Sequence, residues 1–439
     1  MSGEIYYTIM KKILYIAALL AAFACTPTQN GENNNETEQP EASYADFERV
    51  ALKSEIQNVQ PMTGIVLWNT HSKVNTDNIQ LEYSYMLYND VCKAQGVYDW
   101  TPMDKLLEQA ASRGHQVVVR FRYTYVGQQC AVPDYIKAWP GYEEMSGKSE
   151  GRTTYFPDWR CEELQRFHLE FHKKFAERYD KDPRLAFVQT GFGLWAEYHI
   201  YDGPCKIGRT FPSKEFQETF FKEMDKYFDE TTWSISIDAA DSFYSPLKAK
   251  KELLDIPFGN FDDSFMHETH HEYNRDCWLF FGEDSYKDAP RGGEFSYYSS
   301  YDQRNCLNKE GMYGRTFESQ VEEYHMTYIL GNDQPSYQTM DRIKEASMSM
   351  GYKFEIKDFR VKGDEAAVLI SNIGVAPIYR HAYVAVGGVK GEYSLKNLMP
   401  GDEVWIHIKG EGVSAQAVPT IECDHLVPGQ KIEYKANVK

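Results

Sequence analysis

The alternation of strand-like runs with amphipathic stretches between residues 45 and 350 constrains the fold most. Eight runs rich in β-branched and aromatic residues occur there, at residues 64–68, 81–88, 115–123, 185–194, 233–238, 258–265, 292–298 and 324–330. Stretches with apolar residues every three or four positions follow them, at residues 102–113, 161–179, 213–228, 317–323 and 336–350. Alternation of this kind is typical of parallel βα units. It predicts a (β/α)₈ TIM barrel, and the alternative, a doubly wound sheet, lacks a GxGxxG motif or P-loop.

Residues 351–439 show a different pattern of apolar and polar residues. Alternating apolar and polar residues occur at 352–361, 366–372, 383–386, 404–409 and 431–434, between turns rich in Gly, Asp and Pro. No helical pattern separates them, so we predict a small all-β sandwich after the barrel. We expect this domain to pack on the barrel as a structural module rather than bind carbohydrate, since only Trp405 and a few tyrosines offer a stacking surface.

The N-terminus indicates export. A basic start at Met10 leads into an apolar run at residues 13–23 that is too short to span a membrane. The stretch Ala21-Ala22-Phe23-Ala24-Cys25 resembles a bacterial lipobox and implies acylation of Cys25. Residues 1–25 are therefore predicted to be a lipoprotein signal peptide and residues 26–44 a disordered tether, with an ordinary signal peptide as the alternative. We expect a cell-envelope lipoprotein held to the outer membrane by its lipid, on the surface or the periplasmic face.

The other cysteines bear on disulfides. Seven remain after Cys25, and an odd number in an exported protein means at least one free thiol. No CxxC pair suggests zinc or a redox site. We expect one or two disulfides among the loop cysteines.

Composition limits the classes of molecule that the protein is expected to bind. The formal net charge is −18, which opposes binding to nucleic acid. Aromatic residues make up 15% of the chain, and aromatic faces not needed in a core are suited to stacking on sugar rings. The alternative is that tyrosines simply fill surface and loops. We expect a monomer whose partner is a polysaccharide or oligosaccharide.

Two glutamates stand at the ends of predicted barrel strands. The fourth strand runs into Glu197, and Glu294 follows two glycines in the seventh. Active sites of TIM barrels lie at the carboxyl ends of the strands. A retaining glycosidase needs a carboxylate nucleophile and a carboxylic acid facing each other. The pair therefore predicts that chemistry, although either residue alone would be read as a solvated loop residue or an ion-pair partner.

These segments carry a family resemblance. Gly193-Leu194-Trp195-Ala196-Glu197 and Gly292-Gly293-Glu294 resemble the fourth-strand and seventh-strand motifs of the clan A glycoside hydrolases. Residues 45–439 as a whole are similar to a group of barrel-plus-β-sandwich lipoproteins found among polysaccharide-degrading enzymes. The resemblance implies that Glu197 is the acid/base and Glu294 the nucleophile. Most of that clan has Asn before the acid/base, where this chain has Ala196, so another side chain would have to contact the sugar 2-hydroxyl.

Strand alternation identifies further inward side chains. Arg120 and Arg122 share a face, with Arg122 nearer the mouth. Such a charge either keeps a carboxylate nucleophile ionised or forms a structural ion pair in the barrel core. Asp238 lies near the rim by the same alternation. The predicted substrate-binding residues are Trp68, Arg122, Trp195, His199, Asp238, Asp263, His267 and Tyr297. Trp139 and Trp159 are further candidate sugar platforms, with core packing as the alternative.

A polar cluster after the sixth strand suggests a metal site at first sight. It comprises Asp262, Asp263, His267, Glu268, His270 and His271. The spacing is not HExxH and fixes no third ligand, so hydrogen bonding to substrate by Asp263 and His267 is favoured. We expect no metal and no cofactor. A Ser-His-Asp hydrolase is disfavoured, since the chain has no GxSxG motif.

The sequence therefore predicts a retaining glycosidase that hydrolyses β-linked polysaccharide or oligosaccharide, with an algal galactan as the candidate substrate. The alternative is a non-catalytic surface glycan-binding lipoprotein on a decayed barrel.

Overall fold

The computed structural model describes residues 44–439. The predicted signal peptide, the predicted acylation site Cys25 and the predicted tether up to residue 43 lie outside the described residues. Within residues 44–439, no helix combines the length and the apolar character needed to cross a lipid bilayer.

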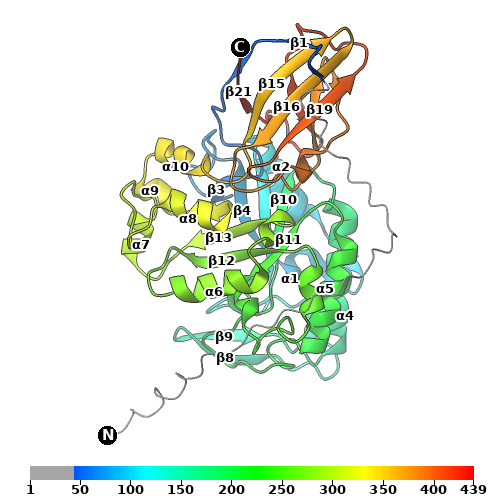
Figure 1. Cartoon of the computed structure of the whole chain (residues 1–439). Coiled ribbons are helices and arrows are strands. Elements are labelled where there is room, and N and C mark those ends of the chain that lie inside the picture. Colours follow the sequence, from blue (N-terminus) through cyan, green and yellow to red (C-terminus); the bar gives the residue numbers. More distant parts are fainter. Residues whose placement is uncertain (1–43) are drawn as a thin grey trace, which may run out of the picture. The chain divides into compact units, whose positions relative to one another are not determined.

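Eight parallel strands form a closed barrel, which confirms the predicted fold (Figure 1). They occur in chain order around the barrel, and the eighth strand pairs with the first. The strands are β3 (Gly64–Trp68), β4 (Leu81–Leu87), β7 (Gln116–Arg122), β10 (Leu185–Gln189), β11 (Trp233–Ser236), β12 (Gly259–Phe265), β13 (Arg291–Phe295) and β14 (Met326–Leu330). Each overlaps one of the eight predicted runs. The carboxyl ends of all eight strands therefore meet at one mouth.

The helices predicted from apolar periodicity are present. They are α2 (Thr101–Ser112), α4 (Glu162–Tyr179), α5 (Lys214–Tyr227), α8 (Phe317–Tyr324) and α10 (Met340–Ser347). Helix α5 is an example. At its start the Ser213 side chain accepts a hydrogen bond from the Phe216 amide. Phe216, Phe220 and Met224 are buried on one face of the helix. The last predicted helix, at residues 336–350, is split, because a short helix α9 (Gln334–Tyr337) precedes α10.

The remaining elements of the barrel are short, apart from one helix. Two hairpins pair β5 (Cys92–Ala94) with β6 (Val97–Tyr98), and β8 (Met145–Ser149) with β9 (Arg152–Phe156). The other helices are α1 (Tyr88–Val91), α3 (Asp134–Lys137), α6 (His271–Phe281) and α7 (Ser300–Asn305). Single 3₁₀ turns are η2 (Leu194–Ala196), η3 (Ile237–Ala240), η4 (Lys251–Asp255) and η5 (Ser285–Lys287).

Aromatic side chains fill the layer between the strands and the helices. Phe121 of β7 meets Phe171 and Phe175 of α4 at centroid distances of 4.9 and 5.0 Å. Much of the high aromatic content therefore serves the core, a role distinct from both sugar stacking and the filling of surface and loops.

Two sheets form the predicted C-terminal sandwich. The larger contains β15 (Phe354–Lys362), β16 (Glu365–Asn372), β19 (Glu403–Lys409) and β21 (Tyr434–Val438), together with β1 (Glu48–Arg49) and β2 (Leu52–Ser54) (Figure 1). The smaller contains β17 (Ala382–Val386), β18 (Val389–Lys390) and β20 (Thr420–Cys423), and a 3₁₀ turn η6 (Leu395–Asn397) lies nearby in the sequence. All pairs are antiparallel except β15 with β21. The strand predicted at residues 431–434 instead begins at Tyr434.

The sandwich shares a hydrophobic core with the barrel. One continuous cluster joins Val66, Val118 and Phe187 of barrel strands to Phe354 and Val384 of the two sheets. Arg380 is buried at this junction, and its Nη2 donates hydrogen bonds to the Leu185 carbonyl at 3.2 Å and the Thr231 hydroxyl at 2.8 Å. Leu185 begins β10, so the sandwich covers the amino-terminal end of the barrel, opposite the mouth.

The predicted disulfides are wrong for the part of the chain that the structure describes. All seven cysteines there are free thiols, namely Cys92, Cys130, Cys161, Cys205, Cys277, Cys306 and Cys423. Five are buried, and they pack within the barrel's core as small hydrophobic side chains.

The Arg380 junction predicts cooperative stability. Replacing Arg380 with Ala removes the donor for two buried oxygens. The free energy of unfolding, measured in urea, should therefore fall by about 3 kcal/mol. Arg304→Ala, at an exposed position on α7, should change it by less than about 0.5 kcal/mol. Equal effects of the two substitutions would contradict the role assigned to the junction.

Candidate active site

Arg120 lies at the centre of the barrel mouth. Its register partners are Tyr85 on β4 and Gln189 on β10, and only 2% of its surface is exposed. The guanidinium donates from Nε to the Gln189 side-chain oxygen at 2.7 Å and from Nη2 to Asp263 Oδ1 at 2.9 Å. Its Nη1 is 3.9 Å from Glu197 Oε1. Burial alone would lower the pKa of Arg120, but Asp263, two tyrosines and Glu197 raise it well above its ordinary value.

A hydrogen-bonded layer inside the barrel supports Arg120. Gln189 also accepts a hydrogen bond from the Tyr83 hydroxyl at 3.1 Å and donates one to the Tyr328 hydroxyl at 2.8 Å. Tyr328 needs space that only glycine leaves, since a Cβ on Gly292 would lie 2.3 Å from its ring. Gly292, the first of the two glycines before Glu294, therefore leaves room for the Tyr328 ring. Sequence reasoning gave this layer no role, although a Gln in a fully buried strand is a usable signal.

The segment from Gly191 to His199 is wound tightly after β10. Trp195 and Ala196 have φ angles of 59° and 58°, which side-chain-bearing residues rarely adopt. The Gly193 amide donates to the Glu197 carbonyl at 2.8 Å, and a Cβ on Gly193 would lie 1.8 Å from the His199 carbonyl oxygen. The Trp195 carbonyl accepts from the Tyr85 hydroxyl at 3.2 Å and from Arg120 Nη1 at 3.3 Å. Strain of this kind is kept where surrounding contacts enforce it, and here it positions Glu197.

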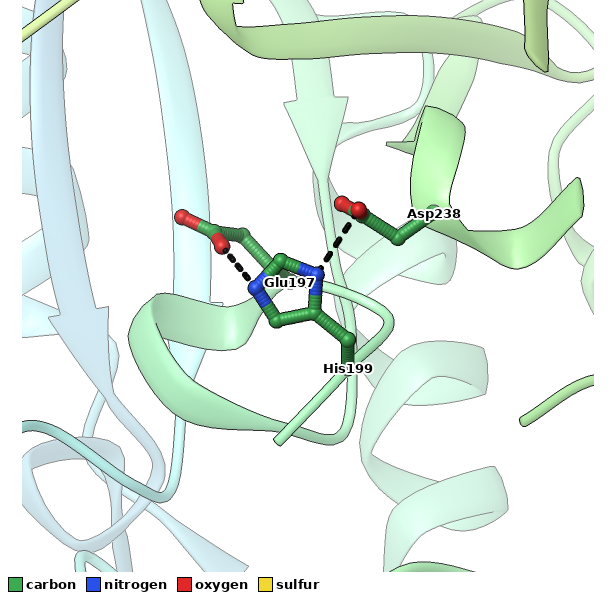
Figure 2. Close-up of side chains that lie close together, drawn as sticks. All are labelled: Glu197, His199 and Asp238. Carbon is green, nitrogen blue, oxygen red and sulfur yellow. Dashed lines mark ion pairs between the residues drawn. The ribbon is translucent and has the colours of Figure 1, made fainter. Parts of the chain in front are cut away.

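Glu197 and Asp238 face opposite edges of one imidazole ring. His199 Nε2 is 3.0 Å from Glu197 Oε2, and its Nδ1 is 2.8 Å from Asp238 Oδ1, as Figure 2 shows. Asp238 comes from η3, directly after the fifth strand, and also accepts a hydrogen bond from Ser236 at 2.9 Å. The structure therefore brings together three predicted site residues from two neighbouring strand ends.

Glu294 and Asp263 face Arg120 from β13 and β12. Burial raises the pKa of Glu294 to about 7, and the charge of Glu197 adds to this while Arg120 opposes it. Burial also raises the pKa of Asp263 well above its ordinary value; Arg120 opposes this rise, and Glu197 and Glu294 add to it. The charge of Glu197 therefore acts on Glu294, and the charges of both glutamates act on Asp263. The mouth holds a group of carboxylates that share one guanidinium.

Aromatic side chains surround these charges. The Trp68 ring centroid lies 4.9 Å from that of Tyr83 and 5.3 Å from that of Tyr85, while Tyr125 meets Trp195 edge-on at 4.3 Å. The Trp195 indole donates to the Tyr201 hydroxyl at 3.1 Å. Further exposed aromatic residues on the segments after the fourth and seventh strands are Tyr201, Tyr297, Tyr298 and Tyr301.

Other predicted residues lie in different surroundings. Arg122 donates to Gln128 at 2.9 Å, and its guanidinium stands 4.4 Å from the Tyr125 ring centroid, so the arginine that meets the carboxylates is Arg120. Trp159 is no sugar platform: it is 1% exposed and packs against Phe192 and Phe216 in the core. Trp139 is exposed and follows α3.

The polar cluster after the sixth strand divides between the two faces of β12. Asp263 points to Arg120, whereas Asp262 accepts hydrogen bonds from the Asn274 amide of α6 at 2.9 Å. Burial raises the pKa of Asp262 to about 7. His267 lies outside this pair, with Nε2 3.9 Å from Asp302 and its ring 4.6 Å from that of Tyr298.

One group among residues 44–439 is close enough to share a metal ion. It is Glu197, His199 and Asp238, whose potential ligand atoms lie within 4.8 Å of one another. The two carboxylates face opposite ring nitrogens, however, so only one of them stands beside each nitrogen. The three side chains form a carboxylate, imidazole, carboxylate chain of ion-pair contacts.

Comparison with known proteins finds likeness in structure. No protein-family model and no curated protein matches the chain. A trimodular GH5_4 endoglucanase is 12% identical, over 87% of this chain and 78% of its own, with a TM-score of 0.39. An α-galactosidase from Thermus thermophilus is 12% identical over 72% and 66%, with a TM-score of 0.40. A GH5_18 structure from Bifidobacterium longum is 8% identical over 66% and 79%, with a TM-score of 0.40. The likeness is one of fold alone, and we carry no residue role over from it.

The environment of Glu294 predicts a pH-dependent stability effect. Its pKa in the folded protein, about 7, exceeds the ordinary 4.5, so the folded state binds its proton more tightly. This contribution to stability is complete below pH 4.5 and is lost as pH rises through 7. Glu294→Gln should therefore raise the free energy of unfolding by about 3 kcal/mol at pH 8.

At pH 4.5 the same variant should be nearly neutral. Glu108→Gln, an exposed position on α2, is the matched control and should have no effect at either pH. Denaturant unfolding at both pH values measures the difference. A Glu294→Gln variant less stable than the wild type at pH 8 would contradict the electrostatic description.

Proposed function

We propose that the protein is a glycoside hydrolase that cleaves β-linked polysaccharide or oligosaccharide with retention of configuration. One observation carries the proposal: Glu197 and Glu294, at the carboxyl ends of the fourth and seventh barrel strands, interact electrostatically across a mouth that contains Arg120. Two facing carboxyl groups are what a double displacement at an anomeric carbon requires.

In the proposed mechanism Glu294 is the nucleophile. Its carboxylate attacks the anomeric carbon, the bond to the leaving oxygen breaks, and Glu197 gives that oxygen a proton. Glu197 then takes a proton from water, whose oxygen attacks the anomeric carbon and releases Glu294. Arg120 favours the ionised form of Glu294 that a nucleophile needs, while burial and the charge of Glu197 outweigh it and raise the pKa of Glu294 to about 7.

The surroundings support a sugar substrate. Trp68 and Trp195 stand at the mouth among tyrosines, and aromatic faces stack on sugar rings. We place Arg122, His267 and Tyr297 among the groups that contact the glycan beyond the reacting sugar, with Asp263 nearer the reacting centre. An algal galactan is our proposed substrate within this class.

The alternative is a glycan-binding protein without catalytic activity. Buried carboxyl groups that repel one another cost stability, and a binding function alone does not require them. The charges at the mouth therefore favour catalysis. Release of reducing ends across a panel of β-linked polysaccharides tests the proposal, and binding without any product would favour the alternative.

Substitutions of the two glutamates should impair catalysis in different ways. Glu294→Ala should lower turnover at least about a thousandfold on every substrate, because it removes the nucleophile. Glu197→Ala should lower hydrolysis of polysaccharide about a hundredfold or more but still react with an aryl glycoside that has a good leaving group. Added azide should then yield a β-glycosyl azide from Glu197→Ala. Full activity of Glu197→Ala on polysaccharide, or an inverted first product by proton NMR, would contradict the assignment.

We also propose that the enzyme is a lipid-anchored protein of the outer membrane. The basic start, the apolar run and the lipobox-like sequence before Cys25 support this. Cys25→Ser should release an active, soluble protein from the membrane fraction. A variant that stays in the membrane fraction would exclude acylation of Cys25 as the anchor.

A further inference from the structure

The environment of His199 differs from that of a substrate-binding histidine. Both ring nitrogens are already engaged, Nε2 with Glu197 at 3.0 Å and Nδ1 with Asp238 at 2.8 Å (Figure 2). The side chain is 19% exposed, so little of it is available to a ligand. Its nearest neighbours are therefore the proposed acid/base and a second carboxylate that the proposed mechanism does not use.

The two contacts restrict the protonation of the ring while both carboxylates are ionised. A neutral imidazole has one donor and one acceptor nitrogen, whereas an imidazolium has two donors. Carboxylates only accept hydrogen bonds, and here one faces each nitrogen. The ring satisfies both ionised carboxylates only when it carries both protons. The arrangement is then carboxylate, imidazolium, carboxylate.

Asp238 is itself held for this role. The Ser236 hydroxyl donates to Asp238 Oδ2 at 2.9 Å, and the same hydroxyl accepts from the Tyr198 amide at 2.8 Å. The chain of contacts therefore returns from the fifth strand to the Glu197 segment. It fixes the ring from the side opposite Glu197.

We propose that His199, charged and oriented by Asp238, is a positioning residue that holds the Glu197 carboxylate and places a positive charge beside it. This inference rests on the proposed function, since it concerns the acid/base step of that reaction. The histidine binds one carboxylate oxygen, Oε2, and leaves Oε1 toward Arg120 and the mouth.

The charge has a use in both steps. In the first step the imidazolium stabilises the negative charge that develops on Glu197 as its proton passes to the leaving oxygen. In the second step Glu294 is esterified and no longer repels Glu197. The imidazolium then stabilises Glu197 as the base that accepts a proton from water.

The surrounding charges agree with this assignment. Burial alone would lower the pKa of His199, but Asp238 and Glu197 outweigh it and hold the pKa well above 6.5. Burial would likewise raise the pKa of Asp238, but His199 and Ser236 hold it below its ordinary value. The other titratable or charged groups that face this chain from neighbouring elements are Tyr85, Arg120, Tyr201, Tyr244, Asp262, Asp263, His270, Tyr273, Cys277, Glu294 and Tyr298.

An NMR titration tests the charge without substrate. In full-length protein labelled with ¹⁵N-histidine, the signal lost in His199→Gln identifies the ring. We expect an imidazolium that persists at pH 8 in the wild type and a neutral ring at pH 8 in Asp238→Asn. Titration of the wild-type ring near pH 6.5 would overturn the inference, whether or not the protein is an active glycosidase.

Kinetics test the consequence for the acid/base step. Asp238→Asn keeps a hydrogen-bond acceptor beside the ring but removes the carboxylate charge, so the ring becomes neutral. The basic limb of the pH profile of kcat/KM should then move up by about one pH unit. His199→Gln should show the same shift and a fall in kcat of about ten- to a hundredfold. His407→Gln, at an exposed position on β19, is the control and should leave both unchanged.

The outcomes separate the two proposals. A fall in activity with no shift of the limb would show a structural role and overturn the inference. Loss of activity with EDTA and its return with Zn²⁺ would also overturn it, because a metal ion would replace the ring proton. A persistent imidazolium in a protein that releases no sugar from any glycoside would contradict the proposed function instead.

Discussion

The arrangement of the barrel mouth depends on a single buried guanidinium. Arg120 donates to Gln189 and Asp263, approaches Glu197, and also holds the Trp195 carbonyl. A buried arginine without partners would be very costly, and a group of buried carboxyl groups without a cation would be more so. Each therefore requires the other. The residual imbalance, with several acids for one guanidinium, is visible in the raised pKa values of Glu294 and Asp263.

The same interaction links charge to backbone geometry. The segment after β10 places two consecutive residues with side chains, Trp195 and Ala196, at positive φ. Arg120 and Tyr85 donate to the carbonyl between them, and Gly193 allows the chain to close on His199. The strained turn sets the direction in which Glu197 leaves the strand end. Packing of the sandwich on the opposite end of the barrel leaves this mouth free for ligands.

Local sequence pattern predicted the parts of the fold that depend on it. The eight strands follow from buried runs, and Glu197 and Glu294 follow from their position at strand ends. Contacts between distant segments were not predictable in this way. Alternation placed Arg120 inside the barrel, but the side chain that meets Asp263 depends on the register between β7 and its neighbours. Trp159 lies in a loop of the sequence, and its burial comes from contacts with α4 and α5. The free cysteines of the described residues show that a set of loop cysteines does not by itself predict a disulfide.

Trapping the covalent intermediate tests the central claim most directly. A 2-fluoro-2-deoxy-β-glycoside with a good leaving group slows both steps, so a glycosyl-enzyme should accumulate. Peptide mass spectrometry of the trapped protein should then locate one sugar on Glu294. A sugar on Asp263 or any other residue would contradict the roles proposed for the carboxyl groups of the barrel mouth.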